Sequence, residues 1–98
     1  MLTEREEPRA QEVATVTEQE LRALVVAADE SHRVSARAWR VEGLAVRKAA
    51  QSEDPSDVEA ARVARAEALA AEAAERAAVR AADRALLAMR GARPRGVL

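Results

Sequence analysis

The sequence predicts an all-α fold: a long antiparallel helical hairpin with helices over about residues 18–50 and 56–90. Ala, Arg and Glu are the three commonest residue types, a composition typical of long helices. Apolar residues recur at helical spacing on both sides of the middle of the chain. Between these segments lies Pro55, which lacks a backbone donor and disfavours helical backbone at Asp54. We therefore expect the chain to fold back at residues 51–57.

The first helix has a start signal at Thr17, followed three residues later by Glu20. This spacing is a capping box, in which the threonine side chain accepts from the Glu20 amide and the carboxylate reaches back. Gly43 is a weak point within this helix, because glycine favours helix less than alanine does. At about 100° per residue, the predicted apolar face of this helix comprises Leu21, Leu24, Val25, Ala28, His32, Ser35, Trp39 and Val46.

The second helix has two competing start signals. Asp54 can cap it with Pro55 at the first helical position, or Ser56 can cap it with Glu59 completing a capping box. Gly91 ends it. Most of its apolar face is alanine, which allows a neighbouring helix to approach closely: Ala61, Ala64, Ala68, Ala71, Ala78, Val79, Ala82, Leu86 and Met89.

Charge is divided between the two halves of the hairpin. Residues 31–50 carry five cations and one acid, a balance of +4, whereas residues 51–83 carry eight acids and four arginines, a balance of −4. Folding at the turn places these segments side by side, in a register where the numbers of facing residues add to about 107. This register pairs His32 with Glu75 and Glu42 with Arg65, and it sets Trp39 against alanines around position 68.

The hairpin is expected to need a partner. Most hydrophobic residues are alanines and the only aromatic residue is Trp39, so a lone hairpin would have a poor core. We expect self-association, or docking on a larger assembly, to complete a four-helix bundle from the hairpin at 17–91, with a flexible acidic arm at 1–16 and a basic tail at 92–98. The interface candidates are Trp39, Val34, Val41, Leu44, Val63, Leu69 and Leu87.

Composition excludes several kinds of site. The absence of cysteine rules out disulfides and thiolate metal ligands. No apolar run approaches the roughly 20 residues needed to cross a bilayer, and the N-terminus has no apolar signal-peptide core, so we expect a cytoplasmic protein without membrane contact. With no phosphate-binding glycine loop and no nucleophile–base arrangement, we predict a non-enzymatic structural or protein-interaction subunit, with no cofactor, metal ion or catalytic residue.

A second hypothesis concerns the segment Glu30-Ser31-His32-Arg33-Val34, which is followed by Asp54-Pro55 and an Ala/Arg-rich helix. This half of the chain resembles the dimerisation and phosphoacceptor hairpin of sensor histidine kinases. Where that family often has Lys-Asn after His-Arg-Val, this chain has Ser35-Ala36. The resemblance implies a phosphotransfer-like dimeric hairpin that uses His32, and it requires His32 to be exposed.

A third hypothesis is an accessory nucleic-acid-binding role. It would use a basic face of the first helix formed by Arg33, Arg37, Arg40, Arg47 and Lys48. The chain offers no aromatic platform for single strands and its net charge is −1, so we expect this face to be solvated or paired within the hairpin.

Overall fold

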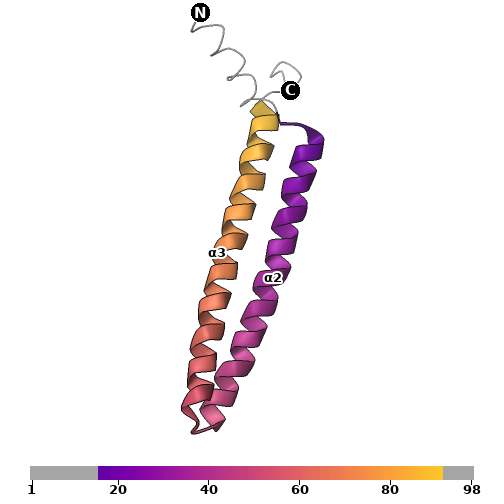
Figure 1. The fold of residues 1–98 in the computed structure, drawn as a ribbon. Coiled ribbons are helices and arrows are strands. Elements are labelled where there is room, and N and C mark those ends of the chain that lie inside the picture. The colour runs from indigo at the N-terminus through magenta and orange to yellow at the C-terminus, as the bar shows by residue number, and fades with distance from the viewer. Residues whose placement is uncertain (1–15, 92–98) are drawn as a thin grey trace, which may run out of the picture.

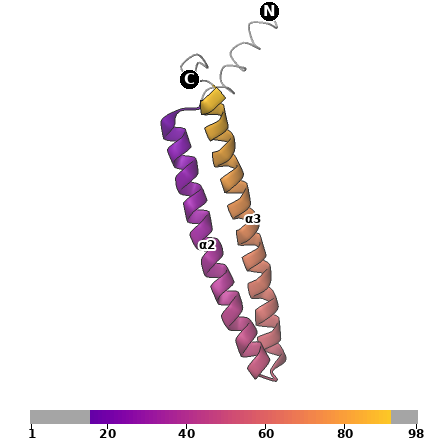
Figure 2. The ribbon, with the colours of Figure 1, turned by 180° about the vertical axis from the view of Figure 1, so that it is seen from behind.

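The computed structural model describes residues 16–91, which form helix α2 (Glu18–Gln51) and helix α3 (Pro55–Gly91). The two helices lie side by side and run in opposite directions, as both views show (Figures 1 and 2). The predicted all-α hairpin is confirmed, and each helix end lies within one residue of the predicted position. Apart from Val16, the predicted terminal segments at 1–16 and 92–98 lie outside the described residues.

Helix α2 begins at a capping box. Thr17 has extended backbone, and the Glu20 amide donates to its Oγ1 at 3.0 Å. The Thr17 hydroxyl in turn donates to Oε1 of Glu20 at 3.1 Å, so the carboxylate returns to the side chain of the cap. The amide of Leu21 donates to the Thr17 carbonyl at 3.0 Å. The bond to Thr17 Oγ1 satisfies the Glu20 amide, which the first turn of a helix leaves unpaired.

Asp54 caps helix α3. Its Oδ1 accepts from the Ser56 amide at 2.9 Å, and its carbonyl accepts from the Asp57 amide at 3.1 Å. Pro55 then occupies the first helical position, where its missing donor costs nothing. Of the two predicted starts, the chain therefore uses the first. The hydrogen bond from the Ser56 backbone lowers the pKa of Asp54 below its ordinary value.

The residues that face the other helix alternate in steps of three and four, which is the heptad spacing of a coiled coil. We call these residues the seam. All of them are buried or half-buried: Leu21, Leu24, Ala28, Ser31, Ser35, Ala38, Glu42, Ala45 and Ala49 on α2, and Asp57, Ala61, Ala64, Ala68, Ala71, Glu75, Ala78, Ala82, Ala85 and Met89 on α3. The seam is thus built mainly from alanine.

The observed seam differs from the predicted apolar faces. Val25, Val46, Val79 and Leu86 were expected to face the other helix, but each is at least 38% exposed. Small residues such as Ala85 are buried instead. The reason is steric, because helices that touch through alanine lie too close together to admit a branched side chain between them. The larger side chains consequently flank the seam.

Gly43 offers a direct test of helix propensity. A Cβ placed there would meet no heavy atom within 4 Å. Because glycine in a helix interior is about 1 kcal/mol less favourable than alanine, Gly43→Ala should raise the free energy of unfolding by about that amount in urea titration. Ala36→Gly, at an exposed position two turns earlier, is the matched control and should lower it similarly. A loss of stability in Gly43→Ala would mean that a partner occupies this side of α2.

Candidate functional site

The shortest polar contact between the helices joins His32 and Glu75. Nδ1 of the imidazole lies 2.7 Å from Oε2 of the carboxylate. The Glu75 side chain lies in the seam and is 24% exposed, whereas His32 lies beside the seam with its side chain 67% exposed. Since a carboxylate can only accept, Nδ1 is the donor. This contact orients the ring and makes Nε2 the nitrogen available for further chemistry.

The environment of Glu75 keeps its carboxylate ionised. The hydrogen bond from His32 lowers the pKa of Glu75, and a hydrogen bond from Ser35 acts in the same direction. Partial burial opposes both effects but does not outweigh them. Ser35 is only 4% exposed and is the one buried polar residue among residues 16–91. The seam therefore holds a charged group near its middle, paired to a ring on the surface.

Two further ion pairs cross between the helices. Nη1 of Arg65 lies 3.8 Å from Oε2 of Glu42, and Nζ of Lys48 lies 3.6 Å from Oδ1 of Asp57. In both pairs the acid belongs to the seam and the cation is largely exposed, so a long basic side chain reaches inward to a shielded carboxylate. The structure thus brings together both predicted pairs, His32 with Glu75 and Glu42 with Arg65.

The Lys48–Asp57 pair was not predicted. The signal for it was present, because the residue numbers of all three cross-helix pairs add to between 105 and 107. Exposed ion pairs are individually weak, since water screens them. Their common register gives them a different effect: sliding one helix along the other by one heptad would separate all three pairs together. Seam pairs of this kind specify alignment more than they stabilise it.

The seven interface candidates do not share one surface. Trp39 is half-buried beside the seam, on the same side as His32. By heptad position, Val34 and Val41 flank the other side of the seam, and Leu44 and Val63 lie farther from the seam on that same side. Leu69 lies toward the side of Trp39, and Leu87 points away from the seam. Apart from Trp39, all candidates are between 46% and 62% exposed.

The basic face of α2 is partly engaged within the hairpin. Nη2 of Arg33 lies 2.9 Å from Oδ2 of Asp29, and its Nη1 lies 3.7 Å from Glu30. Lys48 is engaged with Asp57. Two of the five cations that would contact a phosphate backbone therefore already have acidic neighbours, and nucleic-acid binding remains an untested prediction.

Acidification should reveal the contribution of Glu75. Because its pKa in the folded chain lies below the ordinary value of 4.5, its stabilising effect is complete above that value. The effect is lost as the pH falls through the lowered pKa. We expect the stability difference between the native chain and Glu75→Gln to shrink as pH falls through this window, measured by urea unfolding at a series of pH values. A difference that stays constant with pH would contradict the charged contact.

Other kinds of site find no support in residues 16–91. Within that range no three or more His, Cys, Asp or Glu side chains are grouped so as to hold a metal ion. Neither α2 nor α3 combines the length and the apolar character needed to span a membrane.

Comparisons of the chain with protein-family models, curated proteins and solved structures find no match. Its function is therefore inferred from the chemistry of the hairpin surfaces.

Proposed function

We propose that this chain is a non-enzymatic helical hairpin that acts through protein–protein interaction, by oligomerising or by docking on a larger assembly. The observation that carries the proposal is the contrast between the seam and the surface. Among residues 16–91, only Ser35, Ala64, Ala68 and Ala85 are buried. Twelve valines and leucines in the same range are between 38% and 62% exposed.

The energies favour burial of this surface against another protein. Ordering the backbone costs about 1–2 kcal/mol per residue, and a buried alanine offsets little of that cost because its side chain is a single methyl group. Complete burial of a valine or leucine contributes about 1.5–3 kcal/mol, so covering a few half-exposed ones adds several kcal/mol. A partner that covers one face therefore supplies stabilisation that the alanine seam lacks.

The test follows the helical content and the mass of the full chain together. Circular dichroism and sedimentation velocity are recorded over a dilution series through micromolar concentrations. We expect the helical signal and the sedimenting mass to fall together on dilution, or the isolated chain to be largely unfolded until its partner is added. A fully helical monomer whose unfolding free energy does not depend on concentration would overturn the proposal.

The exposure of His32 favours a second candidate function, phosphoryl transfer. The ring is mostly in solvent and anchored through Nδ1, which leaves Nε2 accessible to a phosphoryl donor. In this case, incubation with a small acyl phosphate or phosphoramidate should give an acid-labile phosphohistidine detectable by ³¹P NMR. His32→Gln is the control and should give none. Absence of label on the native chain would remove this candidate.

A further inference from the structure

The hairpin has two broad faces, one on each side of the seam. In an antiparallel pair of helices, the residues that flank the seam on α2 lie beside their counterparts on α3. His32 and Arg65 mark one side, through their contacts with Glu75 and Glu42. Lys48 marks the other side, through Asp57. We name the first the histidine face and the second the valine face.

The valine face presents apolar residues from both helices. It comprises Val34, Val41 and Leu44 from α2 and Val63, Ala70 and Ala74 from α3, all of them exposed. The histidine face also carries valines, but His32, Arg65 and Glu72 lie across its middle. Those three side chains already contact Glu75, Glu42 and Arg76 within the hairpin, so the polar groups of this face need no second copy to pair with.

Two charged residues, Arg37 and Glu67, lie among the apolar residues of the valine face. Both are exposed, and within residues 16–91 neither takes part in an ion pair. In the observed register Glu67 on α3 lies within about two residues of the height of Arg37 on α2, or about 3 Å along the axis. Arg37 lies on α2 and Glu67 on α3. Arg37 of one copy can therefore meet Glu67 of a second copy only if α2 of the first lies over α3 of the second.

Two copies can pack their valine faces together in two symmetric ways, and the charges along the helices favour one of them. A twofold axis along the hairpin lays α2 of one copy over α3 of the other, with both turns at the same end. This arrangement sets the +4 segment at 31–50 against the −4 segment at 51–83. A twofold axis across the hairpin lays α2 over α2 with the turns at opposite ends. The +4 segment then faces residues 19–38, in which three acids and three arginines cancel. The first arrangement brings opposite charges together and the second does not, so the first is preferred.

Shape and area agree with the first arrangement. In the register of the hairpin, Val34 of one copy lies between Ala70 and Ala74 of the other, where a large side chain meets small ones, and Leu44 lies level with Val63. A face about 50 Å long and two helices wide offers about 1,000 Å² on each copy. A standard stable interface buries about 800 Å² per partner, so one face is sufficient.

We infer that the partner of this chain is a second copy of itself, packed through the valine face with α2 of each copy over α3 of the other and with both turns at the same end. The inference rests on the proposed function and specifies its partner. The result is a four-helix bundle in which Arg37 of each copy pairs with Glu67 of the other.

The direction of the dimer is tested by cross-linking. The chain contains no cysteine, so single ones can be introduced into the full chain by Glu53→Cys in the turn and Gln19→Cys near the start of α2. We expect a flexible bis-maleimide cross-linker, much shorter than the hairpin, to link each variant to itself, and a mixture to give no mixed dimer. Mixed dimers without self-linked ones would overturn the inferred direction, because the two sites lie about 50 Å apart on one copy.

The face is tested with a matched pair of substitutions on α2. Val41→Arg on the valine face should abolish dimerisation in sedimentation velocity, whereas Val46→Arg on the histidine face, at a similar exposure, should leave it intact. The reverse result would overturn the choice of face. Because Val41→Arg also threatens folding, a charge exchange gives an independent test. Arg37→Glu and Glu67→Arg should each weaken the dimer at least several-fold, and the double variant should restore it.

The outcomes separate this inference from the proposed function. Native chains that associate with turns at opposite ends, or that fold only with a different protein, overturn the inference and leave the proposed function standing. A stable helical monomer overturns both. Loss of dimerisation in Val41→Arg, together with self-linked Glu53→Cys dimers, supports both.

Discussion

Replacing Ala68 with leucine should force the helices apart and lower the free energy of unfolding by about 3 kcal/mol, the upper end of the usual cost of overpacking. Ala68 has no exposed surface and lies in the middle of the alanine seam. A leucine side chain at this position of α3 fits only if α2 moves away from α3. In a hairpin with so small a core, this loss should appear as a large drop in helical content at room temperature, measured by circular dichroism.

The control for this change is Ala66→Leu, at an exposed position on the same helix. Leucine and alanine both favour helix, so the control isolates the effect of the seam from that of propensity. We expect Ala66→Leu to unfold at nearly the native urea concentration. Equal stability of the two variants would show that the helices do not touch at Ala68.

A single alanine inserted between Ala66 and Glu67 should abolish cooperative unfolding. Each added residue turns the rest of a helix by about 100°, so every later seam residue of α3 would leave the interface. Glu75 would turn away from His32 in the same movement. Because no repacking restores both halves of the seam at once, we expect a broad, featureless thermal transition.

An insertion of equal size in the turn is the control. One glycine added after Glu53 lengthens a short loop, which costs only a few tenths of a kcal/mol in closure entropy. That variant should retain a cooperative transition near the native midpoint. If the insertion in the helix were tolerated equally well, the heptad seam would not be what holds the two helices together.

The hairpin and its helix ends could be predicted from the sequence because local chemistry determines them. The Thr17 side chain caps α2 through hydrogen bonds to a residue three positions away. Asp54 and Pro55 terminate one helix and start the next within a few residues. None of these interactions depends on how the helices pack. They therefore leave a clear pattern in the sequence.

The register was predictable for a different reason. A short turn limits how far one helix can slide along the other, and acids at apolar positions need cations opposite them. Those two constraints together led to the pairing of His32 with Glu75, which lie 2.7 Å apart, and of Glu42 with Arg65, 3.8 Å apart.

The composition of the seam could not be read from hydrophobicity. Ranking residues by apolar character selects Val25 and Val46, yet both are at least 45% exposed. The spacing between helices decides which residues enter the seam, and this spacing is set by the alanines of α3. Small residues on α2, such as Ser31 and Ala38, are therefore half-buried in their place. That outcome depends on both helices together and appears in neither segment alone.

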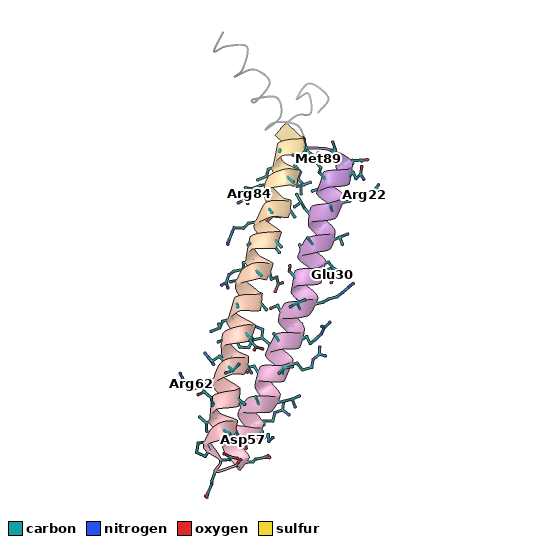
Figure 3. The ribbon with its side chains drawn as sticks, in the orientation of Figure 1. Arg22, Glu30, Asp57, Arg62, Arg84 and Met89 are labelled. Carbon is teal, nitrogen blue, oxygen red and sulfur yellow. The ribbon has the colours of Figure 1, made fainter. Side chains whose placement is uncertain are left out.

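Helix α2 starts and helix α3 ends at the same end of the hairpin, where Figure 3 places Arg22 and Met89, while Asp57 lies at the other end. This arrangement has a mechanical consequence. A load that pulls the two chain ends apart acts on one seam layer at a time, beginning near Leu21 and Ala85, and unzips the hairpin at low force. A load between the turn and both ends together runs along the helix axes, where it is borne by the backbone hydrogen bonds of the two helices. The hairpin is therefore compliant in one direction and stiff in the other.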